Sequence, residues 1–173
     1  MSANIKPARL ALALVASYFL SIAALFHSPG GWLHDGKQPL LSDYIAIHAA
    51  GLLVADGHPT AAYDWKHITE AHTCTLGREE TSFFPFPYPP PYLAVAHTLS
   101  LAGYVAGALT FLVLTFAGYL AALRRITGST GGTILMAASP VTLLNIYILQ
   151  NGFLTGGLLG AALALLSAQP VLS

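Results

Sequence analysis

The sequence carries very little charge, and this shortage limits the class of protein more than any other feature. Only 8% of its 173 residues are charged, whereas 55% are hydrophobic. A soluble domain has about 25% charged residues. Too few charged side chains are therefore present to cover a surface that faces water. The composition predicts that lipid is the principal solvent of this chain.

The sequence also lacks a net charge and nearly lacks cysteine. Seven Lys and Arg residues balance seven Asp and Glu residues. Nucleic acid is not an expected partner, because phosphate binding requires a basic face. Cys74 is the single cysteine, so no disulfide can form within the chain. No Gly-rich phosphate loop is present, and no nucleotide site is expected.

The first long apolar run covers Leu10 to Phe26, 17 residues without a charge, which is the lower limit for a membrane-spanning helix. A cleaved signal peptide is the alternative, but its apolar core has ~7–15 residues and ends at a small-residue site. No such site follows Phe26, so an uncleaved helix is favoured. Lys6 and Arg9 precede the run and place the N-terminus in the cytoplasm.

Further apolar runs predict an all-α, polytopic membrane protein with about four transmembrane helices. Arg124 and Arg125 mark the cytoplasmic end of the second span. The expected runs are a short re-entrant helix at 92–101 and spans at 104–123, 133–149 (kinked near Pro140) and 153–166. Residues 1–173 then form one membrane domain in the inner (plasma) membrane. Its first helix covers 10–27, an extracytoplasmic loop with interfacial helices covers 28–91, and the re-entrant helix with three spans covers 92–173.

The polar stretch from Ser42 to Pro91 is the longest between apolar runs. A helix is expected over 40–56, with Ser42 as its N-cap and an apolar side formed by residues 41, 45, 52 and 53, so that it lies at the membrane interface. A second helix is expected over 60–75, capped by Thr60. The prolines predict an extended polyproline II segment from Pro85 to Pro91.

Several short motifs stand in a fixed order along the chain. They are Ser42-Asp43-Tyr44, Ala49-Ala50, Gly57, Ala62-Tyr63-Asp64, Tyr88-Pro89-Pro90-Pro91 and Gln150-Asn151-Gly152. In this order and spacing they resemble the N-terminal part of glycosyltransferase family 87, which contains GT-C type membrane enzymes. The resemblance covers Ser42 to the C-terminus. Family members are longer and carry more spans, so it implies a partial GT-C architecture, completed by further helices, for instance from a second chain.

The resemblance implies transfer of a hexose, typically mannose, from a polyprenyl-phosphate sugar to a glycan or glycolipid acceptor at the outer membrane face. The acceptor hydroxyl must lose a proton to a carboxylate, and Asp43 is the candidate general base. The alternative for Asp43 is electrostatic support of a helix N-terminus. A leaving phosphate needs positive charge, and Lys37, Lys66 and Arg78 are the cations of the outer segment, although each also fits a solvated loop charge.

The other candidate substrate-binding residues each have a structural alternative. Tyr88, Pro89 and Pro90 shape the lipid entrance or form a rigid turn. Gln150 and Asn151 bind sugar hydroxyls or cap a helix.

A metal cofactor is not expected. His67 and His72 are five residues apart and do not share a helix face, although Cys74 is near. The alternative functions are a non-enzymatic or degenerate small integral-membrane protein or subunit and, with less support, a small transporter, which would carry charges inside its spans.

Overall fold

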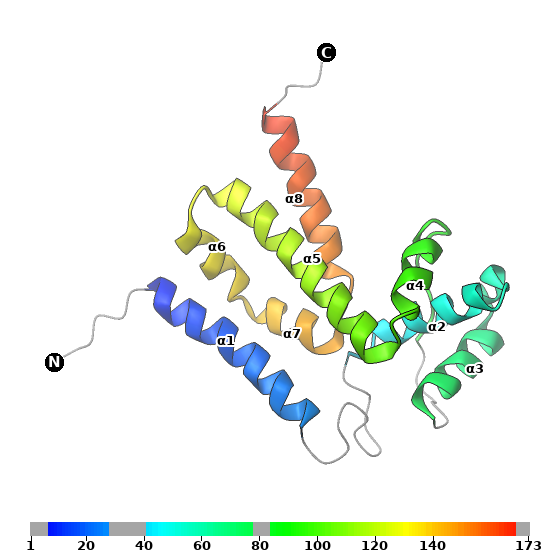
Figure 1. Cartoon of the computed structure of the whole chain (residues 1–173). Coiled ribbons are helices and arrows are strands. Elements are labelled where there is room, and N and C mark those ends of the chain that lie inside the picture. Colours follow the sequence, from blue (N-terminus) through cyan, green and yellow to red (C-terminus); the bar gives the residue numbers. More distant parts are fainter. Residues whose placement is uncertain (1–6, 28–40, 78–83, 169–173) are drawn as a thin grey trace. The chain divides into compact units, whose positions relative to one another are not determined.

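The computed structural model describes residues 7–27, 41–77 and 84–168. Within these ranges every regular element is a helix, which confirms the all-α class. The chain forms two compact units (Figure 1). Unit 1 contains Met1–Gly31 and Leu112–Ser173, and unit 2 contains Trp32–Phe111. The boundary between the units falls inside helix α5, and each unit is described by itself.

Unit 2 consists of short helices packed around one central helix. The central helix is α2 (Tyr44–Ala55), which packs against α4 (Tyr92–Ser100) and α3 (Trp65–Leu76). A 3-10 helix, η1 (Pro59–Tyr63), joins α2 to α3. Gly51 permits the close approach of α2 to α4, because a Cβ atom at this position would meet the backbone of Ala96.

Helix α2 is enclosed on all sides over its first two turns. All eight residues from Tyr44 to Gly51 are buried, whereas Leu52 and Leu53 near its end are half-exposed. The prediction of one apolar side along this helix is therefore wrong. A helix that is apolar all round belongs in the interior of a protein, and α2 is the core of unit 2.

The helix starts in unit 2 also differ from the sequence predictions. Helix α2 begins at Tyr44 with Asp43 as its N-cap, not at Leu40 with Ser42 as the cap. The expected helix over 60–75 is divided, because Pro59 opens a 3-10 turn that ends at Tyr63. Asp64, not Thr60, caps α3: its Oδ1 accepts hydrogen bonds from the backbone N–H groups of Lys66 and His67.

Unit 1 contains the rest of α5 (Tyr104–Thr127) together with α1 (Pro7–Phe26), α6 (Thr130–Ala137), α7 (Pro140–Ile148) and α8 (Gly152–Ala168). Helix α1 lies beside α6 (Figure 1), and the hydroxyl of Tyr18 donates a buried hydrogen bond to the carbonyl oxygen of Ala138. Ring contacts join α1 to α5, through Phe19 and Phe116, and α5 to α8, through Phe116 and Phe153.

Helix α5 is the clearest candidate for a membrane span, with 24 residues. It starts after Gly103, whose φ of 77° ends the preceding segment, as predicted. The expected third span is broken rather than kinked, since α6 and α7 are separate helices bent by 61°. Pro140 begins α7, where its missing N–H is not needed. By length and composition, one or two spans are found among the described residues.

Candidate active site

Asp43 stands at the start of α2, and a hydrogen-bonded turn holds it there. The turn begins at Leu41, a buried non-glycine residue with a φ of 62°. This left-handed conformation costs about 1–2 kcal/mol, so neighbouring contacts must hold it. One such contact is a buried 2.9 Å hydrogen bond from the Tyr104 hydroxyl to the Leu41 carbonyl oxygen. Tyr104, the first residue of α5, thereby positions Leu41, which lies two residues before Asp43.

The carboxylate of Asp43 is not used as a helix cap. Its side chain makes no capping hydrogen bond to α2, although the residue occupies the N-cap position. The Ser42 hydroxyl donates to Asp43 Oδ1 over a long distance of 3.5 Å. By contrast, the carboxylate of Asp64 is fully engaged in capping α3. The side chain of Asp43 is half-buried.

A cavity of about 220 Å³ lies beside Asp43. Its other lining residues are Ala46, Phe84, Pro85, Pro87 and Tyr88. Asp43 and Tyr88, both candidates from the sequence, therefore face the same space. Aromatic rings and prolines form the walls, so the cavity holds one carboxylate in a largely apolar, rigid frame.

An aromatic cluster made of Tyr63, Phe86, Tyr88 and Tyr92 fixes the wall that carries Tyr88. The rings of Tyr88 and Tyr92 stack with centroids 4.5 Å apart, and Phe86 packs on both. The Tyr63 hydroxyl donates a 2.9 Å hydrogen bond to the Tyr88 carbonyl oxygen. These contacts hold Tyr88 in one place without any regular secondary structure.

The proline segment is not a continuous extended stretch. The carbonyl oxygens of Pro89 and Pro90 accept hydrogen bonds from the N–H groups of Tyr92 and Leu93. Pro91 has helical φ and ψ angles of −60° and −24° and is the N-cap of α4. The prediction of polyproline II as far as Pro91 is therefore wrong at its end, where the last prolines form the turn into α4.

The titratable side chains around Asp43 are held in their neutral forms. Burial raises the pKa of Tyr88, and the negative charge of Asp43 raises it further. Burial likewise raises the pKa of Tyr44 and lowers the pKa of His48. A neutral phenol can donate a hydrogen bond but is a poor base at neutral pH. Among the described lining residues Asp43 is the one carboxylate.

Three of the described candidates in unit 2, Pro89, Pro90 and Lys66, are not among the residues that line this cavity. Pro89 and Pro90 are exposed in the turn before α4, and Lys66 is exposed on α3. Lys37 and Arg78 lie outside the described residues. Gln150 and Asn151 belong to unit 1, where they connect α7 to α8 after Leu149, which has a φ of 54°. The Asn151 carbonyl oxygen accepts hydrogen bonds from Thr155 in the first turn of α8.

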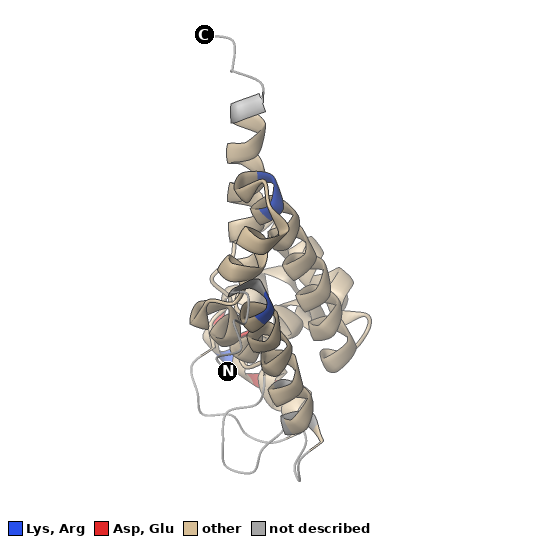
Figure 2. Ribbon diagram, turned by 90° about the vertical axis from the view of Figure 1, so that its left-hand side faces the viewer, with Lys and Arg blue, Asp and Glu red and all other residues tan. Residues whose placement is uncertain are grey.

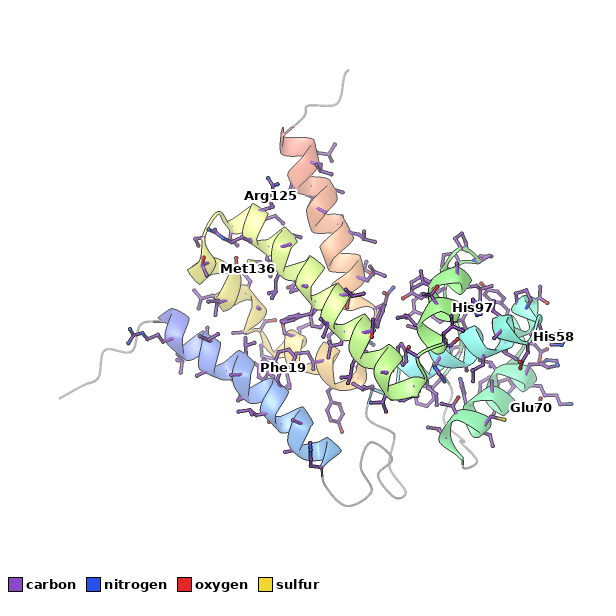
Figure 3. The ribbon with its side chains drawn as sticks, viewed as in Figure 1. Phe19, His58, Glu70, His97, Arg125 and Met136 are labelled. Carbon is purple, nitrogen blue, oxygen red and sulfur yellow. The ribbon has the colours of Figure 1, made fainter. Side chains whose placement is uncertain are left out.

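In the part of the chain that the structure describes, no three His, Cys, Asp or Glu side chains lie close enough together to hold a metal ion. The Nδ1–H group of His67 donates a 2.7 Å hydrogen bond to Asp64 Oδ1, and Cys74 is exposed. His58 and Glu70 extend from separate elements of unit 2 (Figure 3).

Sequence reasoning missed three residues that shape the site. Ala46 follows Asp43 by three positions, a helical spacing that places both on one face and that could have been read from the sequence. Tyr104 comes directly after the helix-ending Gly103, but nothing in its local sequence indicates a contact with Leu41. Phe84 carries no sequence signal for its place in the cavity wall.

Comparison with protein-family models gives a match to the second half of the chain. The model of glycosyltransferase family 87 matches residues 86–173, about half of the chain. No curated protein and no solved structure matches. The matched region begins within the aromatic cluster and includes Tyr88, Gln150 and Asn151, whereas Asp43 lies outside it.

Proposed function

The chain belongs to glycosyltransferase family 87, and from this membership we propose that it transfers a hexose, with mannose as the expected sugar, from a polyprenyl-phosphate donor to a glycan or glycolipid acceptor. Membership in the family implies glycosyl transfer. The observation that carries the rest is the cavity beside Asp43, where a carboxylate that caps nothing faces Tyr88.

In this proposal Asp43 is the general base. Its carboxylate accepts the proton of an acceptor hydroxyl while the hydroxyl oxygen attacks the anomeric carbon of the donor sugar. The bond between that carbon and the phosphate oxygen breaks, and the polyprenyl phosphate leaves with the bonding electrons. A general base must lie within hydrogen-bond reach of the acceptor hydroxyl. The half-buried carboxylate of Asp43, at the wall of a cavity, meets that requirement.

The size and walls of the cavity suit one sugar unit. Its volume of about 220 Å³ is below the ~300–1,000 Å³ of sites that enclose a whole drug-sized ligand. The cavity thus holds the reacting part of the acceptor, and the long lipid chain of the donor stays outside. The phenol of Tyr88, kept neutral by its raised pKa, is available to donate a hydrogen bond to a sugar oxygen.

A direct test replaces Asp43 with Asn, which keeps the shape and removes the base. Membranes of the native host that lack the gene are complemented with the full chain, so that any partner chain is present. Transfer of a radiolabelled hexose from its polyprenyl phosphate is then measured. Removal of a general base reduces the rate about 10²–10⁴-fold.

Asp56→Asn is the matched control, because Asp56 is an exposed carboxylate at the other end of the same helix. Its transfer rate is expected to equal that of the wild type. If the Asp43→Asn variant transfers hexose at the wild-type rate when both proteins are present at the same level, Asp43 is not part of the mechanism. Loss of transfer in both variants would indicate a general effect on α2 instead.

The proposed location is the inner (plasma) membrane, with four spans and the Asp43 cavity on the outer face. Helix α5 supports this arrangement, because its charge-free run ends at two arginines. The bent pair α6 and α7 counts as one broken span, and α1 and α8 are the shorter apolar helices that complete the set.

A non-enzymatic membrane subunit is the second candidate. The observation in its favour is that no cation is among the described residues lining the cavity, although a leaving phosphate needs one or an equivalent donor. A second chain that supplies further helices would also supply that charge. Transfer that requires both chains, and that is lost with Asp43→Asn, assigns the carboxylate to this chain.

A further inference from the structure

Unit 1 contains a second cavity, of about 260 Å³, enclosed by helices α1, α5 and α6. It lies within unit 1 alone and shares no residue with the cavity beside Asp43. The residues that matter here are Leu12 and Val15 of α1, Phe116, Leu120 and Arg124 of α5, and Ile134 of α6.

The part of α5 that lines this second cavity is apolar up to Arg124. Phe116, Leu120 and Arg124 follow each other at four-residue intervals and so form one stripe on that helix. Leu12 in the opposite wall is 55% exposed, so this wall is itself accessible at the surface of unit 1. An apolar groove with an accessible wall beside a candidate span suits a hydrocarbon chain.

Arg124 stands at one end of the groove, where the apolar part of α5 ends. The run from Tyr104 to Leu123 has no charged residue, so Arg124 marks the level at which a span meets the membrane surface. Arg125 follows it at the same end of α5 (Figure 3). Arg9, near the start of α1, is also exposed.

These arginines have no acidic residue in their own unit. All seven Asp and Glu residues lie between residues 35 and 80, which belong to unit 2. Figure 2 colours red those that the structure describes. Unit 1 by contrast holds Lys6, Arg9, Arg124 and Arg125. Guanidinium groups at a membrane surface bind phosphate well, since their donors match its oxygens. An anionic headgroup of the membrane can therefore supply a counter-ion for them.

We propose that this groove binds an anionic phospholipid. One acyl chain lies in the groove against Phe116, Leu120 and Ile134, and the phosphate is bound by the guanidinium group of Arg124. Basic pockets between membrane helices bind anionic headgroups in the same way. The bound lipid fills the space that α1 leaves open against α5.

The test uses the purified full chain in neutral detergent. Equal amounts of phosphatidylglycerol and phosphatidylcholine with identical acyl chains are added, and native mass spectrometry counts the bound lipids. The wild type is expected to favour phosphatidylglycerol about tenfold or more, because phosphatidylcholine offers the same phosphate but adds a quaternary ammonium whose positive charge offsets the attraction to Arg124. Arg124→Gln is expected to lose this preference.

Arg125→Gln is the matched control. It removes the same charge one residue further along α5, but Arg125 does not line the groove. It is expected to keep most of the preference. Ala137→Leu fills the groove, because Ala137 is a buried lining residue, and should bind neither lipid, with circular dichroism to check that its helices are intact. Thr133→Leu, at another lining position, is a second filling variant.

Three results would overturn the proposal. Equal losses for Arg124→Gln and Arg125→Gln indicate general attraction to a charged surface. Unchanged binding by both folded groove-filling variants places the lipid elsewhere. Stoichiometric displacement of phosphatidylglycerol by an equal amount of undecaprenyl phosphate shows that the groove takes the isoprenoid lipid instead.

Discussion

Asp43 and Asp64 both precede a helix in unit 2, but their side chains are used differently. Asp64 Oδ1 accepts two backbone hydrogen bonds and contacts the ring of His67. Asp43 makes no capping bond, because the turn fixed through Leu41 and Tyr104 sets the start of α2 in place of a side-chain cap. One carboxylate is structural, and the other makes no capping bond to its helix.

At this scale we predict that acid frays the first turn of α3. Hydrogen bonds from His67 and Lys66 hold the pKa of Asp64 below its usual value of 3.8. When the pKa of a carboxyl group is lower in the folded state than in the unfolded state, the group stabilises the fold at a pH above the unfolded-state pKa. This stabilisation is lost as the pH falls through the folded-state pKa. The amides of Lys66 and His67 should therefore lose protection against exchange, relative to the intrinsic exchange rate at each pH, below about pH 4.

Amide hydrogen exchange measured by NMR at several pH values tests this prediction. Asp64→Asn is the control, since Asn is an equally good N-cap and does not titrate. The pH step in exchange at these two amides should disappear in this variant. The prediction is wrong if the variant and the wild type show the same step.

The residues of the site could be predicted from sequence only in part. Asp43 and Tyr88 were selected from a motif string, and the structure brings them to one cavity, but their catalytic and binding roles stay predictions. The N-caps were assigned to Ser42 and Thr60 because their hydroxyls are favourable at that position. Those assignments failed because a left-handed turn and a proline-initiated 3-10 helix, not local propensity, fix the helix starts.

At the scale of the elements, the contact between α2 and α4 depends on Gly51. A Cβ atom there would meet the carbonyl oxygen of Ala96, and would lie 2.7 Å from its carbonyl carbon and from Cβ of Ser100. Two backbones cannot both keep their places with a methyl group between them. The packing of the two helices therefore requires glycine at this position.

We predict that Gly51→Ala lowers the free energy of unfolding by about 1–3 kcal/mol, the usual cost of overpacking. The control is Gly118→Ala in α5, where a Cβ atom meets nothing within 4 Å. That variant is expected to gain up to about 1 kcal/mol from helix propensity. Thermal unfolding in detergent, followed by circular dichroism, measures both. Equal midpoints for the two variants would contradict the packing argument.

The elements differ in how well local sequence defines them. Gly103 and the two arginines mark the ends of α5, and both signals act locally. Helix α2 was expected to be amphipathic because only four of its apolar positions were weighed, whereas burial by α3 and α4 is a tertiary effect. Pro140 was expected to kink a helix, but α6 ends before it and α7 begins at it.

For the whole molecule, we predict that unit 2 lies on the outer side of the membrane. Cys74 tests this prediction, because it is the single cysteine and is exposed on α3. With the proposed topology, a maleimide that cannot cross membranes should label Cys74 from the outside of intact cells. The expected labelling is near complete within minutes, and it should not increase after the cells are opened.

Cys74→Ser combined with Arg125→Cys provides the control, with its one thiol at the predicted cytoplasmic end of α5. It should react only in opened cells. The reverse pattern, in which Cys74 is protected and residue 125 is labelled, would place the Asp43 cavity in the cytoplasm and remove the outer-face proposal.

Proton-binding side chains are concentrated in unit 2. Besides every carboxylate, it contains six of the seven histidines, His27 being the exception. Between neutral pH and pH 4 the Lys and Arg side chains of unit 1 keep their charge, while unit 2 gains a proton at each carboxylate and histidine that titrates. Acidification of the medium therefore acts mainly on residues 32–111, and a response of this protein to acid is expected to originate mostly there.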